Sequence, residues 1–259
     1  MVYLRIIAKN YSLQLQYRMA HIINNFASII FGFVFIAIWT GILTGKDEAN
    51  LLNVQDMTYY VAFTQCLLWL SVFLTPGLGL QDRIRTGAIS LDMIRPVNLY
   101  LLVISQEIGR ILYNAIYRSF FLAILFWLVA HFYVPTGWVT AIWALLSLFF
   151  AIWIGLNLSY IIGISSIWTI EIEWAHLVYI SCVFGLGGQF VPLVYLPEGL
   201  SNLISYLPFA CMIYYPVMFY LEKLPFTPLL IQGSWAVILT LVSIWLTHQT
   251  RKYLEIQGG

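Results

Sequence analysis

Charged side chains are scarce in this chain of 259 residues. Asp, Glu, Lys and Arg together make up 9% of it, whereas soluble domains contain about 25%. Hydrophobic residues account for 61%, and the mean hydropathy is +0.87. This scarcity excludes an ordinary soluble domain and predicts an all-α integral membrane protein. The net charge of +1 gives no basic surplus of the kind that binds nucleic acid, so we expect no nucleic-acid partner.

Cysteine is also sparse, and a signal peptide is not evident. An odd number of cysteines in apolar stretches is no disulfide framework, so we interpret all three as core residues: they are Cys66, Cys182 and Cys211. The N-terminus lacks the compact apolar run and cleavage site of a secretory signal. It instead predicts an amphipathic helix over residues 1–20 in the membrane interface, with Arg5 and Lys9 opposite an apolar face. That face is Leu4, Ile7, Ala8 and Tyr11.

Six segments are long and apolar enough to cross a membrane, which takes about 20 residues. They are residues 22–43, 57–74, 113–133, 138–162, 174–191 and 229–247. Their middles hold essentially no ionisable side chain, and Arg118 and His131 fall near the two ends of the third. Proton- and ion-coupled carriers usually place ionisable residues inside the membrane, so this absence argues against such a carrier.

A seventh candidate, residues 203–221, is interrupted by Pro208 and Pro216. Six of the nine prolines fall between residues 192 and 228, and each interior proline breaks a helical hydrogen bond. We therefore predict short re-entrant helices in this segment, because irregular backbone is tolerated where protein buries it.

The distribution of Lys and Arg sets the predicted orientation. With six spans, ten of these residues lie on the side of both termini, and only Lys46 and Lys223 lie on the other. Because Lys and Arg prefer the cytoplasmic side, we expect both termini to be cytoplasmic and the protein to be multi-pass.

The main cytoplasmic loop is then "RTGAISLDMIRP" with its flanks, residues 81–96. An apolar stripe at helical spacing predicts an amphipathic helix, which Gly87 bends and Pro96 ends. The stripe is Ile84, Ala88, Leu91 and Ile94; the charged residues Arg83, Arg85, Asp92 and Arg95 lie mostly away from it. The next helix has no strong breaker from residue 98 to 133, so we expect it to run about 54 Å and project into the cytoplasm.

Motifs of enzymes are absent. "GILTGKD" lacks the spacing of a phosphate-binding loop, and "GLGL" and "GLGG" are better interpreted as small residues that allow close helix contact. Glu171, Glu173 and His176 do not have the H-E-x-x-H spacing of a zinc site. We therefore predict no catalytic residue, metal or cofactor on this chain. A secondary transporter or a channel stays open as an alternative function.

Three motifs, in order along the chain, resemble the six-span branch of the type-2 superfamily of ABC exporter permeases. Tyr17-Arg18 precedes the first span. The cytoplasmic loop matches G-x-(I/L)-x-x-x-(L/M)-(L/I)-R-P-V through Gly87, Ile89, Met93, Ile94, Arg95, Pro96 and Val97. The proline-rich segment matches through Pro192-Leu193, Leu196-Pro197, Leu200, Leu207-Pro208-Phe209 and Tyr215-Pro216.

This resemblance implies a single permease domain, residues 1–259, in the plasma (inner) membrane of a bacterium, surrounded by membrane lipids. It implies pairing with a second permease, alike or different, and with a cytoplasmic ABC ATPase subunit that carries ATP and Mg. The implied coupling residues are Arg83, Ile84, Arg85, Gly87, Ala88, Leu91, Asp92, Ile94, Arg95 and Pro96. The implied outer gate, residues 192–228, contains Pro192, Pro197, Pro208, Phe209 and Pro216. For the path of an amphiphilic substrate, we propose Phe63, Trp69, Gln189 and Phe190.

A plain cytoplasmic loop, basic only because of topology, is the alternative to a coupling element. The two interpretations differ in whether the apolar stripe of the loop contacts a partner.

Overall fold

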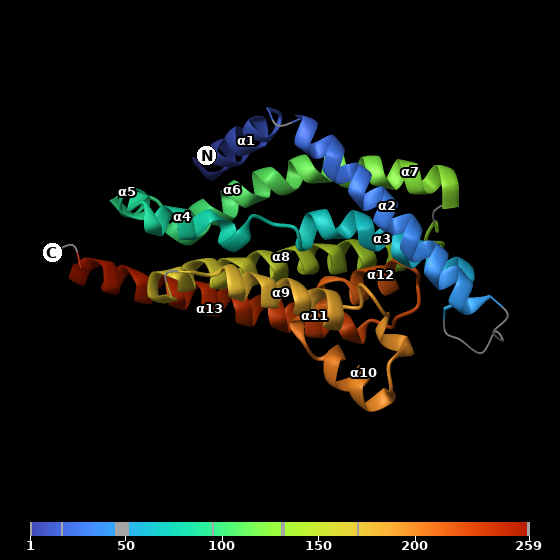
Figure 1. Cartoon of the computed structure of the whole chain (residues 1–259). Helices are drawn as coiled ribbons and strands as arrows, with labels where there is room; N and C mark the ends of the chain where they lie inside the picture. The colour runs from blue at the N-terminus through green and yellow to red at the C-terminus, as the bar shows by residue number, and fades with distance from the viewer. Residues whose placement is uncertain are drawn as a thin grey trace.

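The computed structural model describes residues 2–16, 18–44, 52–94, 96–130, 133–169 and 171–257. Every element in these ranges is a helix, which confirms the all-α class. The long helices run roughly alongside one another (Figure 1). Four residues named above lie outside the described ranges: Tyr17, Lys46, Arg95 and His131. The side chains of Arg18, Arg251 and Lys252 are likewise not described.

Five helical segments are long and apolar enough to span a membrane: Ile23–Leu43, Val54–Arg85, Leu99–Val129, Trp138–Thr169 and Thr227–Thr250. They correspond to five of the six predicted spans. The predicted span at residues 174–191 contains a shorter apolar helix, α9 (Glu173–Leu186), of 14 residues. At 1.5 Å per residue that helix is about 21 Å long, short of the roughly 30 Å hydrocarbon core.

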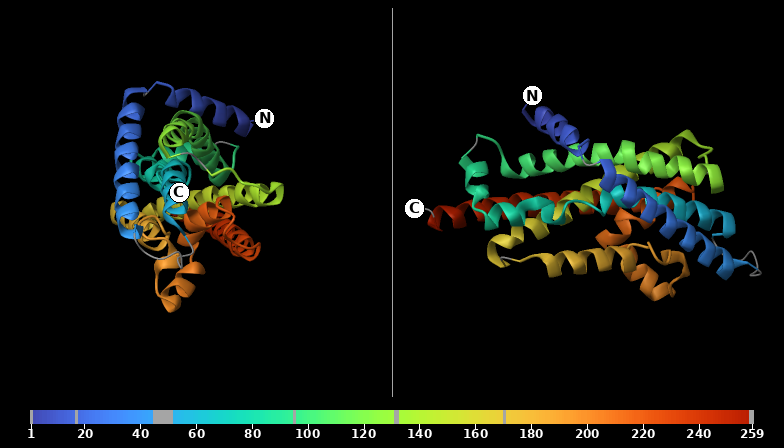
Figure 2. Two further views of the ribbon diagram at one scale, coloured as in Figure 1. Left: turned by 90° about the vertical axis from the view of Figure 1, so that its right-hand side faces the viewer. Right: turned by 45° about the horizontal axis from the view of Figure 1, so that its top comes forward.

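The helix α3 (Val54–Ser71) lies inside the bundle, and α2 (Arg18–Leu43) lies at its edge (Figure 2). In the most apolar window of each span, 61% of the α3 segment is buried but only 22% of the α2 segment. The difference follows from the sequence of α3, whose Tyr59, Tyr60, Val61 and Ala62 are four consecutive buried residues that cover every side of the helix.

The third span is one continuous helical segment, as predicted. It runs through α6 (Leu99–Asn114), a π-helical turn (η2, Ala115–Ser119) and α7 (Phe120–Ala130).

The N-terminal helix α1 (Val2–Gln14) packs along α6. Gly109 permits this contact, because a Cβ atom there would lie 2.4 Å from the carbonyl oxygen of Ile7. Only part of the predicted apolar face of α1 packs against the bundle. Tyr11 packs edge-on against Tyr113, whereas Leu4 is 70% exposed.

The proline-rich segment folds as short helices: η3 (Leu193–Tyr195), α10 (Glu198–Ser205), α11 (Pro208–Met212) and α12 (Tyr214–Tyr220). The interruption of residues 203–221 is as predicted. Helices α11 and α12 are buried against α8 (Trp138–Thr169), whereas α10 projects from the bundle (Figure 1). Gln232 on α13 (Thr227–Gln257) donates to the carbonyl oxygens of Cys211 (2.8 Å) and Ser147 (3.3 Å), which satisfies a carbonyl left free where α11 ends.

Candidate functional site

The predicted coupling stretch forms two helices rather than one. Helix α4 (Leu80–Arg85) ends at Arg85 with Thr86 as its C-cap, and α5 (Ala88–Ile94) begins after Gly87. Gly87 has a φ of +71°, a left-handed conformation that glycine adopts without steric cost. The start of α1, the end of α13 and this α4–α5 loop lie toward the same end of the molecule, and α10 lies toward the other (Figure 1).

The predicted apolar stripe of the loop is divided between core and surface. Ile84 is half-buried and packs with the buried Ile89 against the core. Leu91 is 64% exposed and Ile94 is 80% exposed. Two large apolar side chains of α5 therefore offer an unpartnered surface at the end of the bundle.

The charged residues of the loop differ in position. Arg83 forms an ion pair with Asp92 (Nη1 to Oδ2, 3.2 Å) and donates to the amide oxygen of Gln106 on α6. Asp92 is buried. The sequence placed both residues away from the apolar stripe. In the structure their contacts join α4, α5 and α6. Arg85 and Pro96 are exposed, and Arg95 lies outside the described residues.

A turn of left-handed residues connects α3 to α4. In η1 (Pro76–Gly79), the φ angles of Gly77, Leu78 and Gly79 are +51°, +51° and +70°. For a residue other than glycine this conformation costs about 1–3 kcal/mol, and Leu78 is held in it by burial. The turn touches α8 backbone to backbone, because a Cβ atom on Gly163 would lie 1.9 Å from the carbonyl oxygen of Gly77. The "GLGL" run thus allows close helix contact, as predicted.

Glu107 of α6 fixes the entry to this turn, a role that was not predicted from the sequence. The buried carboxylate accepts hydrogen bonds from the backbone N–H (2.9 Å) and hydroxyl (2.7 Å) of Thr75. Arg110 lies 3.8 Å from the same carboxylate and also donates to the Thr75 hydroxyl. The only signal in the sequence was a carboxylate within a mainly apolar helix. Its partner, Thr75, lies 32 residues earlier and could not be identified from the sequence.

Arg118 lies in the π-turn, in the middle of the long helix that begins at Leu99. Its side chain is only 4% exposed. Its guanidinium lies over the ring of Trp69, 4.0 Å from the ring centroid. Asn114 donates to the carbonyl oxygen of Trp69 (3.2 Å), and Ser119 donates to that of Cys66 (2.7 Å). The π-turn is thus joined to α3 by a buried polar cluster.

The four predicted path residues lie at more than one place. Trp69 lines a pocket of about 270 Å³ between α2, α3 and α9. Phe190 packs edge-on against Phe184 of the same pocket, with ring centroids 5.2 Å apart. Phe63 lines a different pocket of about 280 Å³, where it stacks on Tyr220 at 4.4 Å. Gln189 is buried, and neither atom of its amide has a hydrogen-bond partner among the described residues.

The predicted outer-gate prolines stand at helix starts. Pro192 and Pro197 precede η3 and α10, Pro208 is the first residue of α11, and Pro216 lies in the first turn of α12. Proline suits these positions because a first-turn N–H has no helical partner. Phe209 follows in α11, half-buried against the core.

Glu222, just after α12, forms a clamp with the start of α8. Its carboxylate accepts hydrogen bonds from the hydroxyls of Thr140, Tyr133 and Thr136, and from the backbone N–H of Gly137 (3.1 Å). These bonds, that of Thr140 above all, lower the pKa of the Glu222 carboxyl to about 2. A negative charge therefore caps the N-terminus of α8. Beside the clamp, Lys223 pairs with Asp56 of α3 at 3.0 Å.

Within the described ranges, no three His, Cys, Asp or Glu side chains converge as metal ligands would. A family model described as "ABC-2 family transporter protein" matches residues 22–258 of the chain. No curated protein matches it.

Proposed function

The chain belongs to the ABC-2 transporter family, and on that premise we propose that it is the permease subunit of an ATP-driven exporter. A separate cytoplasmic ATPase subunit binds ATP and Mg, and docks on the α4–α5 loop. The observation that carries this proposal is the pair Leu91 and Ile94, exposed on a helix whose other side is buried.

The docking surface is held rigid before any partner arrives. The Arg83–Asp92 pair ties α5 to α4, and the bond from Arg83 to Gln106 ties both to α6. An anchored helix loses little conformational freedom on binding, so more of the burial energy is available for affinity. Two apolar side chains entering a groove, with Arg85 at the edge, match the helix-in-groove mode of recognition.

The other parts of the proposal follow from the sequence and the family. Lys and Arg are in surplus at the end of the bundle where α1 starts and α13 ends, which favours a cytoplasmic location for that end. We infer a bacterial inner membrane and pairing with a second permease.

A secondary transporter is the competing function, and the buried Arg118 is the observation that favours it.

Co-purification from native membranes tests the choice between these functions. An exporter subunit is expected to come with an ATPase and a second permease, and its transport should require ATP hydrolysis. Transport that continues without ATP and follows an ion gradient would support the secondary transporter instead.

Purified alone, the chain is expected to hydrolyse no ATP, because its sequence has no phosphate-binding loop. The measurement is phosphate release from ATP by the protein in detergent, with the complete complex as the positive control. Hydrolysis that persists in a demonstrably pure sample would contradict the division of labour.

Topology is tested with single cysteines introduced into a background that lacks the three native ones. Asn202 on α10 and Thr86 between α4 and α5 are both exposed. In intact cells, Asn202→Cys is expected to react with a membrane-impermeant thiol reagent and Thr86→Cys is not. After permeabilisation both should react. Labelling of Thr86→Cys from outside would reverse the orientation.

A further inference from the structure

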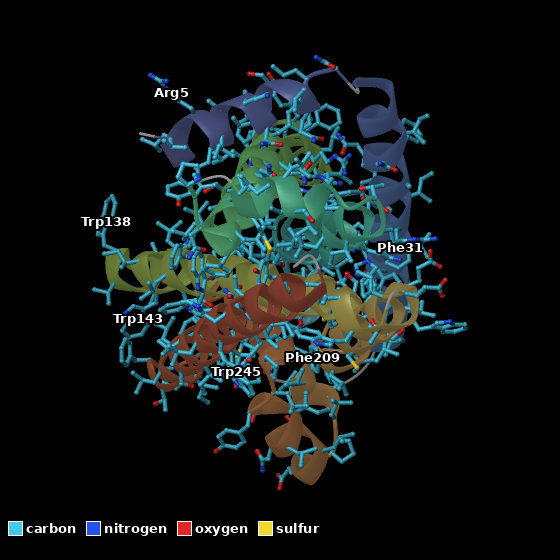
Figure 3. The ribbon with its side chains drawn as sticks, turned by 90° about the vertical axis from the view of Figure 1, so that its left-hand side faces the viewer. Arg5, Phe31, Trp138, Trp143, Phe209 and Trp245 are labelled. Atoms are coloured by element: carbon cyan, nitrogen blue, oxygen red, sulfur yellow. The ribbon has the colours of Figure 1, made fainter. Side chains whose placement is uncertain are left out.

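The pocket between α2, α3 and α9 has aromatic walls contributed by three helices. Phe31 of α2, Trp69 of α3 and Phe184 of α9 line it, with Phe73, just after α3, between the last two. Ring centroids are 5.0 Å apart for Trp69 and Phe73, and 6.0 Å apart for Phe73 and Phe184. Phe31 lies on α2 at the side of the molecule where α9 runs (Figure 3). Such walls favour a flat or cyclic apolar molecule, because rings gain energy in offset and edge-on contacts.

One polar side chain in this pocket is left without a bond. Gln65 of α3 lines the pocket and is 1% exposed, and its amide nitrogen has no hydrogen-bond partner among the described residues. Burying a donor without a partner is costly. The amide offers both a donor and an acceptor, and a half-turn of its end exchanges the two, so a bound molecule that carries an acceptor can satisfy the free donor.

Charge also selects among ligands. The described residues that line the pocket include Asn24, Ser28 and Gln65 but none of Asp, Glu, Lys or Arg. The guanidinium of Arg118 lies over the ring of Trp69, yet Arg118 is not itself a lining residue. An ion would be desolvated here without a paired charge, which is expensive. A neutral molecule meets no such penalty.

We propose that this pocket binds uncharged, largely aromatic or alicyclic molecules that carry a hydrogen-bond acceptor, and that Gln65 donates to the acceptor. This inference rests on the proposed transport function where it names the class of cargo. The binding site itself does not depend on ATP or on a partner subunit.

A second apolar groove on the same chain provides an internal comparison. It lies between α8 and α13, has a volume of about 970 Å³, and is lined by apolar side chains such as Leu241 and Phe149. A merely lipophilic molecule should prefer this larger groove or show no preference. A molecule that needs the amide of Gln65 should prefer the smaller pocket.

The experiment uses two photoreactive probes on the full chain in lipid nanodiscs. Benzophenone is an uncharged aromatic ketone with an acceptor, and a trifluoromethyl aryl diazirine is an aromatic probe without a strong acceptor. After illumination, mass spectrometry measures labelling at Leu68 in the pocket and at Leu241 in the groove. We expect the ratio of Leu68 to Leu241 labelling to be about fivefold higher with benzophenone than with the diazirine, as a single neutral hydrogen bond allows.

Gln65→Leu removes the amide and keeps the volume nearly constant, and Gln65→Met is the second variant in case the first does not fold. Either is expected to abolish the preference of benzophenone for Leu68 and to leave diazirine labelling unchanged. Equal labelling ratios for the two probes in the parent protein would overturn the proposal, as would a preference that survives the variants. Equal loss of both probes in a variant would also count against Gln65 as the donor. The labelling experiment contains no ATPase, so a negative labelling result does not contradict the proposed export function. Conversely, failure to co-purify an ATPase does not contradict a positive labelling result.

Discussion

Leu91→Asp is expected to weaken association with the ATPase subunit at least tenfold and to abolish export. Leu91 is 64% exposed on α5, next to Ile94 at 80%. Burying a leucine-sized side chain contributes about 1.5–3 kcal/mol, and a factor of ten corresponds to about 1.4 kcal/mol. An unpaired carboxylate in an apolar groove adds its own desolvation cost. The measurement is the amount of ATPase that co-purifies with the variant, together with export from cells.

Two comparisons make this result specific. Because Leu91 is exposed in the free chain, the variant should reach the membrane in normal amounts. Arg85→Glu changes an exposed charge near the same surface, so it should have a smaller effect that fades as salt is added. If Leu91→Asp binds the ATPase and exports normally, the loop is basic only because of membrane topology.

Gly163→Ala is expected to cause the largest loss of stability of any single methyl group added to the chain. The new Cβ atom would lie 1.9 Å from the carbonyl oxygen of Gly77 and 2.9 Å from its Cα. Both neighbours are backbone of the left-handed turn, so neither can rotate away as a side chain would. Overpacking of this kind costs about 1–3 kcal/mol and occasionally more, and we expect about 3 kcal/mol here. Thermal unfolding of the purified variant in detergent measures the effect.

Gly185→Ala is the matched control on α9. Apart from its chain neighbours and the nearby backbone of α9 itself, no heavy atom lies within 4 Å of a Cβ atom placed there. Alanine also favours a helix over glycine by roughly 0.5–1 kcal/mol. This control should be as stable as the parent or slightly more so. If both variants lose the same stability, the close contact between η1 and α8 does not determine the stability of this region.

The long helices were predictable because their signal is local. A run of about 20 apolar residues is visible in the sequence whatever surrounds it, and the uninterrupted stretch after Asn98 predicted the continuous third span. The residues at which the helices end were less predictable. The predicted span at residues 174–191 contains a helix only from Glu173 to Leu186, since the chain turns at Gly187 and Gly188 to pack against α12. That turn depends on a tertiary contact, in which the N–H of Tyr214 donates to the carbonyl oxygen of Gly187 (3.0 Å).

The polar parts of the candidate site were harder to predict, because their partners are distant in sequence. Spacing placed Asp92 away from the apolar stripe, which is its position on an isolated helix. The break at Gly87 turns α5, so that Asp92 faces Arg83 and is buried. Arg118 likewise finds its partner far away in the sequence, because its guanidinium lies over the ring of Trp69 on α3. Composition indicated that these residues were unusual, but only the fold supplies the contacts.

The Glu222 clamp has a consequence for biogenesis. Its carboxylate bonds to the N–H of Gly137, which was synthesised 85 residues earlier. During translation, the start of α8 therefore leaves the ribosome long before Glu222, whose carboxylate caps it, has been synthesised. A nascent chain that ends before residue 222 carries an uncapped α8, and the Lys223–Asp56 pair beside the clamp is missing as well. This corner of the molecule is completed only when the connection into the final span has been translated, so the order of synthesis makes it a late step in assembly.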